Sequence, residues 1–205
     1  MKNTYLIYAA KVFSMLFAPF YFPMLAFLVL FVFSYMRLLP VDYKLAILGV
    51  VYGFTVALPL LFTWGYRKIN GLHRRQLSKR EMRTMPYLIF IASYGCCLYC
   101  MIELHMPHFM ISIMWGSLVL QVACALIHRW VHISTHSAAA GAMVGALMAF
   151  SFIFSFDPTW WLCLTLLIAG CVGSSRLILR QHRLREVNLG LLVGLLCGFF
   201  CILLL

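Results

Sequence analysis

The chain has 205 residues, of which 64% are hydrophobic and 10% are charged, and its mean hydropathy is +0.97. These values lie outside the range of water-soluble domains, so they exclude a soluble enzyme and a soluble nucleic-acid-binding module despite the formal net charge of +11. In hydrocarbon every backbone amide must be satisfied within its own segment, so the sequence predicts an all-α protein that uses lipid as its solvent.

Charged residues and prolines divide the sequence into seven apolar runs, each near the ~20 residues that cross ~30 Å of hydrocarbon. Pro19 and Pro23 interrupt the first run, so this run is kinked or re-entrant and the helical bundle has six to seven spans. We expect the first run to be retained, because it is longer than a signal-peptide core and has no A-x-A-like site. No linker or repeat is present, which predicts one integral-membrane domain over residues 1–205. The expected spans are 13–36, 45–66, 86–104, 109–127, 138–156, 159–175 and 187–205.

The polar connections differ in charge. If all seven runs cross, the N-terminus and the connections 67–85, 128–137 and 176–186 share one side of the bilayer, and the opposite side carries only Arg37 and Lys44 of the sixteen Lys and Arg residues. Such a bias marks the cytoplasmic face of a multi-pass cell-membrane protein. It also makes a surface that attracts anionic lipid head groups.

The first basic connection, from Arg67 to Met85, holds seven of the sixteen Lys and Arg residues. Lys79 and Arg83 lie four residues apart within it, so they share a helical face, and Arg80 is a substitute cation beside them. The sequence therefore offers a pair of cations for an anionic group at this surface.

The next basic connection is rich in histidine. His128, His132 and His136 recur at four-residue intervals, so on a continuous helix their imidazoles form a stripe that can bind zinc or iron. No carboxylate ligand is nearby, and a helix break is expected at Ser134-Thr135. The small residues 137–141 then suit a tightly packed helix start. Metal analysis of the purified protein, with His132 substituted, tests this hypothesis.

The last basic connection contains His182 and Glu186, four residues apart. On a helix they are separated by only ~40°, so the carboxylate can hold one ring nitrogen of the imidazole. This contact fixes the tautomer and leaves the other nitrogen basic and directed outward, as a nucleophile or a base requires. Arg176 lies ~120° away on a continuous helix, so a shared phosphate needs a turn, which the run Gly173-Ser174-Ser175 permits.

Two of these segments resemble signatures of one family. The segment 175–186 resembles the third signature, SRx5Hx3D, of the type 2 phosphatidic acid phosphatases, which are integral-membrane relatives of vanadium haloperoxidases. It has Ser175-Arg176, then five residues, His182, three residues and an acid. Glu186 stands where the family has aspartate. The segment 133–136, Ile-Ser-Thr-His, is similar to the second signature, PSGH, in its serine and histidine, and lacks the proline and the glycine. Thr135 supplies a hydroxyl where the glycine is absent.

The first signature, Kx6RP, is matched least well. Lys79 to Pro86 begins and ends as that signature does, but Met85 occupies the place of the arginine, so Arg83 would present its guanidinium from one turn earlier. The three segments occur in the family's order over residues 79–186, about half of the chain.

The resemblance implies a helical membrane fold of the phosphatase type and a role for each matched residue. His182 would attack phosphorus to form a phosphohistidine, Glu186 would orient it, and His136 would protonate the leaving lipid oxygen and later activate water. It implies no metal and no cofactor, because a guanidinium clamp supplies the phosphate contacts. The residues that would bind phosphate are Arg176, Lys79, Arg83, Ser134, Thr135 and Ser175.

The expected substrate is an anionic phospholipid or an isoprenyl phosphate that enters from the bilayer, as a phosphomonoester or a pyrophosphate, and no nucleic acid is expected as a partner. The charge bias predicts a cytoplasmic active site, whereas the resemblance implies a periplasmic one. Two alternatives stay open. The arginines around His182 can be a membrane-anchoring cluster alone, or the chain can be a non-catalytic relative that binds or moves anionic lipid. Phosphate release from short-chain phosphatidic acid by the wild type and by His182→Ala separates the enzyme from a binder.

Overall fold

The computed structural model describes residues 2–33, 38–69 and 80–204, which fall into two compact units. Unit 1 combines residues 1–22 with residues 115–205, and unit 2 comprises residues 23–114. Throughout the described residues every regular element is a helix, which confirms the predicted all-α class. The single domain over the whole chain stays a prediction, and each unit is described by itself below.

Seven segments among the described residues are long and apolar enough to cross a membrane, consistent with a multi-pass membrane protein. They are Ile7–Phe31, Val41–Tyr66, Pro86–Glu103, His108–His128, Thr135–Phe154, Thr159–Ile178 and Leu184–Leu203. The first segment begins and ends earlier than expected, while the other six lie close to the predicted ranges. Hydrophobic runs bounded by charge and proline are therefore sufficient to locate these helices.

The first apolar segment is broken, as its prolines predict. Helix α1 (Lys2–Leu16) ends before Ala18, whose φ of −70° and ψ of 145° are extended. The 3-10 turn η1 (Pro19–Tyr21) follows, with proline at its first positions, and α2 (Phe22–Phe33) begins directly after it. Proline lacks an N–H and has a fixed φ, so it starts a helical turn more readily than it continues one.

Unit 2 contains a π-helical turn within the span Val41–Tyr66. The element η3 is one π-helical turn, and it precedes Pro59, which cannot donate the N–H that a regular helix needs. The hydroxyl of Ser93 donates to the carbonyl oxygen of Phe54 in this turn at 2.5 Å, so the neighbouring helix satisfies a displaced acceptor. The elements are α3 (Val41–Tyr52), η3 (Gly53–Ala57), α4 (Leu58–Ile69) and α5 (Arg80–Glu103).

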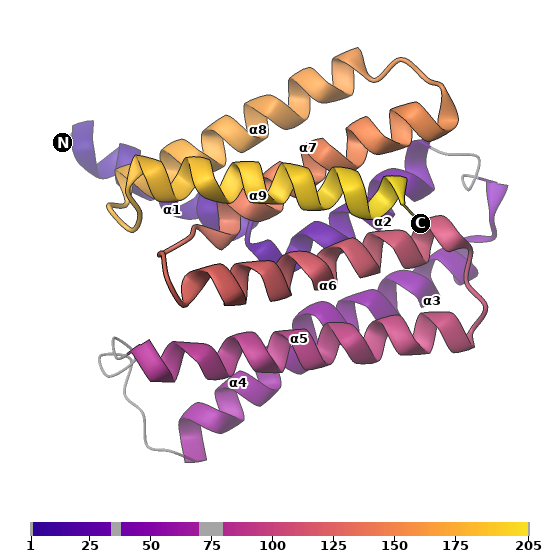
Figure 1. Cartoon of the computed structure of the whole chain (residues 1–205), viewed down its shortest axis with the longest axis horizontal. Coiled ribbons are helices and arrows are strands. Elements are labelled where there is room, and N and C mark those ends of the chain that lie inside the picture. The colour runs from indigo at the N-terminus through magenta and orange to yellow at the C-terminus, as the bar shows by residue number, and fades with distance from the viewer. Residues whose placement is uncertain (1, 34–37, 70–79, 205) are drawn as a thin grey trace. The chain divides into compact units, whose positions relative to one another are not determined.

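Unit 1 holds the long helices of the C-terminal half. Helix α7 packs against α8 and α9, and α1 packs against α8, as Figure 1 shows. Small side chains lie between α7 and α8, where Ala139 and Ala140 on α7 form one buried cluster with Ala169 and Val172 on α8, and Phe22 belongs to the same cluster. The helices are α7 (Thr135–Phe154), α8 (Thr159–Ile178), α9 (Leu184–Leu203) and the part of α6 (His108–His128) from Trp115 onward.

The contact between α7 and α9 is made by backbone. A Cβ atom at Gly194 of α9 would lie 1.8 Å from the carbonyl oxygen of Ala138, and one at Gly141 of α7 would lie 2.2 Å from the carbonyl oxygen of Leu191. Only glycine allows helices to approach this closely, and in a membrane close van der Waals packing is a main source of helix association. The expectation of a tightly packed start of α7 is thereby confirmed.

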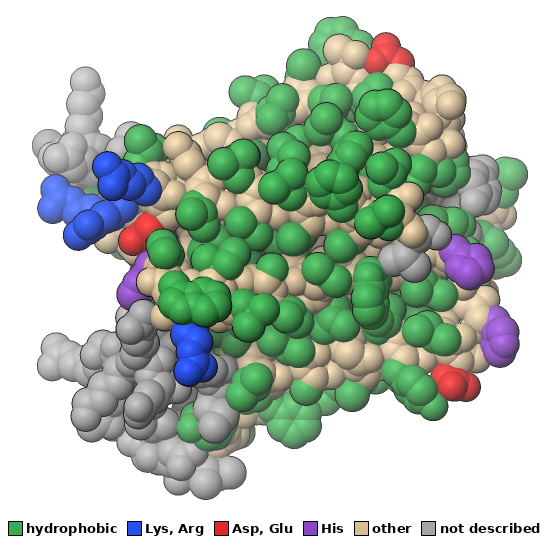
Figure 2. Space-filling view, viewed as in Figure 1, with side chains coloured by type: hydrophobic (Ala, Val, Ile, Leu, Met, Phe, Trp, Pro, Cys, Tyr) green, Lys and Arg blue, Asp and Glu red, His purple; other side chains and the backbone are tan. Residues whose placement is uncertain are grey.

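The connections 129–134 and 179–183 lie at the same end of unit 1, which we call the basic end. The backbone N–H of Ser134 donates to the carbonyl oxygen of Glu186 at 3.4 Å, so the starts of α7 and α9 are adjacent, as predicted. In Figure 2 hydrophobic side chains cover the visible faces of α8 and α9, and Lys and Arg side chains gather where α8 turns into α9. The exposed arginines of these segments and of the first turn of α9 are Arg129, Arg180, Arg183 and Arg185.

Candidate functional site

Helix α7 begins at a serine cap that places His136 in the first turn. Ser134 has extended backbone dihedrals, and its Oγ accepts from the N–H of Ser137 at 3.4 Å and from the Ser137 hydroxyl at 3.0 Å. This is the usual way in which an orphan N–H at a helix start is satisfied. The Ser134 side chain is fully buried and serves the cap here, while Thr135 beside it is half-buried.

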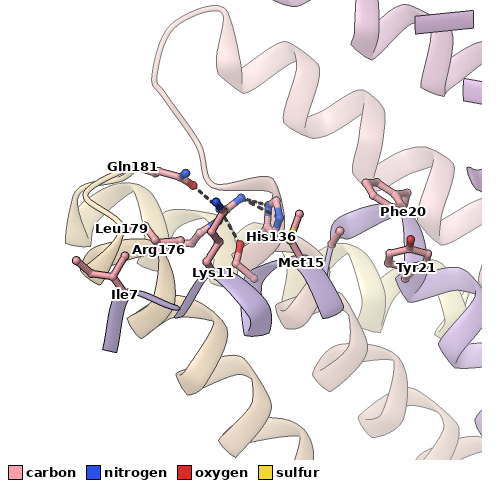
Figure 3. A pocket seen from close by; sticks show the side chains of 11 residues that line it. Ile7, Lys11, Met15, Phe20, Tyr21, His136, Arg176, Leu179 and Gln181 are labelled. Carbon is pink, nitrogen blue, oxygen red and sulfur yellow. Dashed lines mark hydrogen bonds between the residues drawn. The ribbon is translucent and has the colours of Figure 1, made fainter. Parts of the chain in front are cut away.

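Arg176 is the centre of the site. It lies near the end of α8, and only 9% of it is exposed. Nη1 donates to the hydroxyl of Ser14 on α1 at 2.9 Å and to Oε1 of Gln181, while Nη2 contacts both ring nitrogens of His136, with Nε2 at 2.8 Å (Figure 3). A guanidinium has donors only, so His136 accepts and is neutral in this arrangement. Among the described residues Nε of Arg176 has no partner.

His182 and Glu186 form the contact that their spacing predicts. Nδ1 of His182 lies 2.9 Å from Oε2 of Glu186, and both side chains are about one-fifth exposed. In the described structure Nε2 of His182 has no hydrogen-bond partner, so the second ring nitrogen is available for a contact. The imidazole is therefore oriented by the carboxylate in the manner that makes a histidine a nucleophile or a base.

The route to this contact differs from the expected one. His182 does not lie on the helix, because α9 begins at Leu184 with Arg183 as its N-cap. Oε2 of Glu186 also accepts from the N–H of Arg183 at 3.2 Å, so the carboxylate caps the helix and reaches back to the histidine in the preceding turn. The local geometry comes from a helix cap and not from two residues on one helical face.

The expected break at Gly173-Ser174-Ser175 is wrong. Helix α8 continues to Ile178, and the chain turns at 179–183, where Arg180 has a φ of 52°. Ser175 is helical, and its hydroxyl donates to the carbonyl oxygen of Cys171 at 2.7 Å, a bond that satisfies the polar side chain within an apolar helix. Arg176 and His182 are thus linked through this later turn, in which Gln181 contacts the guanidinium.

The two histidines of the predicted site lie at the starts of neighbouring helices. His136 contacts Arg176 directly, and the His182–Glu186 pair stands at the start of α9, beside the start of α7. Lys79 lies outside the described residues. Arg83 is part of α5, but its side chain, like that of Arg80, is not described. The cations of the first signature therefore stay a prediction.

The histidine stripe proposed for a metal does not form. Helix α6 ends at His128 and α7 begins only at Thr135, so His136 is not on the same helix as the other two. The rings of His128 and His132 pack edge to face with centroids 5.0 Å apart. Within the described ranges no three His, Cys, Asp or Glu side chains are grouped as metal ligands. The metal hypothesis thereby loses the geometry on which it depended.

A pocket of about 620 Å³ adjoins Arg176 and His136. Lys11 and Ser14 of α1 and Gln181 of the α8–α9 turn also line it, and none of these three was singled out from the sequence. Lys11 could have been found, because a cation four residues into the apolar segment that starts at Ile7 is costly unless it has a function. Ser14 and Gln181 carry no such signal, since their contacts depend on how α1 packs on α8.

No protein-family model, curated protein or solved structure matches the chain. A functional hypothesis therefore depends on the chemistry of the residues at the basic end.

Proposed function

We propose that the protein is a membrane lipid phosphatase that hydrolyses a lipid phosphomonoester or pyrophosphate through a phosphohistidine, with a fold related to the type 2 phosphatidic acid phosphatases. The observation that carries this proposal is the 2.9 Å contact between Nδ1 of His182 and Oε2 of Glu186, with Nε2 left without a partner among the described residues. A neutral imidazole with one nitrogen held by a carboxylate has a lone pair available on the other.

The chemistry has two displacements at phosphorus. In the first, the lone pair on Nε2 of His182 attacks phosphorus, the bond to the lipid oxygen breaks, and that oxygen leaves with the electron pair and takes a proton from His136. In the second, water attacks phosphorus while His136 accepts its proton, the N–P bond breaks, and phosphate is released. Arg176 offsets the charge on the phosphoryl oxygens in both steps.

The neutral His136 of the substrate-free arrangement fits this sequence of events. Phosphate oxygens are stronger acceptors for a guanidinium than an imidazole nitrogen is, so a bound phosphate takes over the Nη2 donors of Arg176. His136 is then released from its role as an acceptor, takes up a proton from solvent, and passes that proton to the leaving oxygen.

A non-catalytic lipid-binding protein is the second candidate, and one observation favours it. The pocket is lined by Arg176 and His136 but not by His182. The residues that line the pocket are sufficient to bind a phosphate and do not by themselves include the nucleophile, as a lipid-binding protein requires.

Phosphate release from dioctanoyl phosphatidic acid by the purified protein in detergent separates the two functions. We expect release by the wild type and a loss of roughly 10³-fold or more in His182→Ala, because no other group replaces the nucleophile. Acid quenching during turnover, followed by mass spectrometry, should locate the phosphoryl group on His182. Lipid binding without phosphate release would identify a binder and end the phosphatase proposal.

A further inference from the structure

The walls of the pocket at Arg176 differ in chemistry. Lys11, Ser14, His136, Arg176 and Gln181 make one side polar and cationic, while Phe20 and Tyr21 of η1 contribute an aromatic wall elsewhere (Figure 3). None of the described residues that line the pocket is acidic. A volume of about 620 Å³ is that of an ordinary small-molecule site. The combination suits a ligand with an anionic end and an apolar body.

Arg176 provides the electrostatic reason for an anion. It is nine-tenths buried, yet its partners among the described residues, Ser14, Gln181 and His136, are all neutral. A buried cation without a counter-charge is destabilising, because neutral hydrogen bonds recover only part of the lost hydration. The whole sequence has only five acidic residues. An anionic ligand is therefore the group that completes this environment.

Helix α1 supplies the second cation. Ile7, Lys11 and Ser14 lie on one face of α1 at intervals of four and three residues, and all three line the pocket. Lys11 thus points to the same space as Arg176, from a helix that the functional signatures do not include. Two separate cations and an imidazole match the three oxygens and double charge of a terminal phosphate better than they match a carboxylate.

The break after α1 forms the apolar wall. Pro19 ends the helical run and starts η1, so Phe20 and Tyr21 lie half-buried beside the pocket instead of continuing along α1. These half-buried aromatic side chains offer a large apolar surface beside the polar, cationic side of the pocket.

We propose that α1 and η1 complete the pocket as the binding site for an amphiphile with a terminal phosphate, in which Lys11 and Arg176 bind phosphoryl oxygens and the aromatic wall contacts the adjoining apolar part. The proposal rests on the proposed function in that it names the head-group site of the same substrate. Lys11 is the specificity-determining residue, because it distinguishes a doubly charged phosphate from a singly charged head group.

Equilibrium binding to His182→Ala protein in detergent tests the proposal without turnover. The ligands are dioctanoyl phosphatidic acid, inorganic phosphate and dioctanoylglycerol. We expect phosphatidic acid to bind at least about tenfold more tightly than inorganic phosphate, and dioctanoylglycerol to bind at least about tenfold more weakly than phosphatidic acid, since each end of the ligand contributes. Equal binding of phosphate alone, or of the uncharged lipid, would overturn the proposal.

Lys11→Gln provides the residue-level test, and Arg185→Gln is its matched control. Both positions are exposed, and Arg185 lies at the basic end without lining the pocket. We expect Lys11→Gln to weaken phosphatidic acid binding about tenfold or more and Arg185→Gln to change it less than twofold. Equal losses in the two variants would assign the effect to general surface charge and refute a role for Lys11.

Arg176→Met probes the buried cation itself. An unbranched apolar side chain fills similar space without a charge, so the variant should fold while phosphatidic acid binding falls by about a hundredfold or more. Retained binding in folded Arg176→Met would also overturn the proposal.

The two proposals fail separately. Lys11-dependent binding without phosphate release by the wild type would remove the phosphatase and leave the pocket assignment standing. Phosphate release by the wild type, with unchanged binding and KM in Lys11→Gln, would leave the phosphatase standing and remove the pocket assignment.

Discussion

Glu186 has two partners through one oxygen. Oε2 accepts from the backbone N–H of Arg183, which begins α9, and contacts Nδ1 of His182, which orients the imidazole. The first contact needs an acceptor, whereas stabilisation of a histidine that becomes positively charged in the reaction needs a negative charge. The structural and the chemical roles of this residue can therefore be separated by one substitution.

Glu186→Gln should keep the helix cap and lose the charge. The amide oxygen still accepts from Arg183, so the thermal midpoint should stay within a few degrees of the wild type. Phosphate release should fall by roughly 10²–10⁴-fold in kcat, because the imidazole loses its charged partner. Calorimetry and phosphate release in the same detergent measure the two effects. If kcat stays within a few-fold of the wild type while Glu186→Ala unfolds, the carboxylate has a capping role only.

For individual side chains, the sequence was sufficient to predict some contacts of the site and not others. The spacing of His182 and Glu186 predicted their contact, because a histidine and an acid four residues apart can meet either on a helix or at its cap. The contacts of Arg176 with Ser14 and Gln181 were not predictable, because they depend on the packing of α1 and on a turn set by Arg180. The spacing of residues in the sequence predicts contacts within one segment, but it does not predict which distant helix packs against that segment.

At the scale of elements, the backbone contact between α7 and α9 determines the geometry of the site. The helices meet through glycines and alanines, so no side chain can adjust the distance between them. Their starts carry Ser134 and Glu186, which are joined through a backbone hydrogen bond. The separation of His136 from the His182–Glu186 pair is thereby coupled to the packing of the two helices along their length.

Gly194→Ala should be destabilising and also impair the site. Its Cβ would lie 1.8 Å from the carbonyl oxygen of Ala138, so α9 must move away from α7, at a cost of about 1–3 kcal/mol or more. Gly170→Ala on α8 is the matched control, because its Cβ meets nothing within 4 Å, and a gain of up to about 1 kcal/mol is expected from helix propensity. Unfolding midpoints in detergent compare them. Equal midpoints for both variants would mean that the helices are not held this closely.

Asp157 gives the start of α8 a dependence on pH. Its carboxylate accepts from the N–H and the hydroxyl of Thr159, and these hydrogen bonds lower the pKa of Asp157. Because the folded-state pKa is depressed, the stabilisation is present above the usual pKa and is lost as the pH falls through the folded value. Asp157→Asn should therefore be less stable than the wild type at neutral pH and converge with it in acid. A difference in midpoint that does not change between about pH 7 and about pH 3 would contradict this role.

At the scale of the whole molecule, charge is divided between the two ends of α7. The basic end of unit 1 carries the exposed arginines around 129–134 and 179–185, and the connection 155–158 at the other end carries Asp157 and no cation. Positive charge near helix ends favours the cytoplasmic side of a membrane. We therefore expect the basic end, with the candidate site, to face the cytoplasm.

Cysteine labelling at the two ends of α7 tests this orientation. A membrane-impermeant maleimide should label Phe156→Cys in intact cells and Trp130→Cys only after permeabilisation, because both positions are exposed and a membrane-crossing α7 would put them on opposite sides of the bilayer. The wild type, with its eight free cysteines, gives the background. The reverse labelling pattern would place the site outside the cytoplasm, and equal labelling of both positions would contradict the crossing of α7.

The spans were the most predictable feature of the molecule, because hydrocarbon requires long apolar helices and charge marks where they end. Pro19 also predicted the break after α1. The continuation of α8 through Gly173 and Ser175 was not predicted, since a small polar residue is compatible with a break and also with a helix in which its hydroxyl bonds to the carbonyl of the preceding turn. The pocket could not be foreseen because its lining combines segments distant in the chain.

The packing of α1 on α8 has a practical consequence for protein production. Ser14 is buried against Arg176, and Ile7 and Lys11 before it line the same pocket, so a fusion partner or affinity tag placed ahead of Lys2 would join the chain within about two helical turns of Ile7. Tags are better placed after α9, whose last turn lies a full helix length from Glu186. Assays on N-terminally tagged protein should be repeated after cleavage of the tag, so that steric blockage is not mistaken for an inactive enzyme.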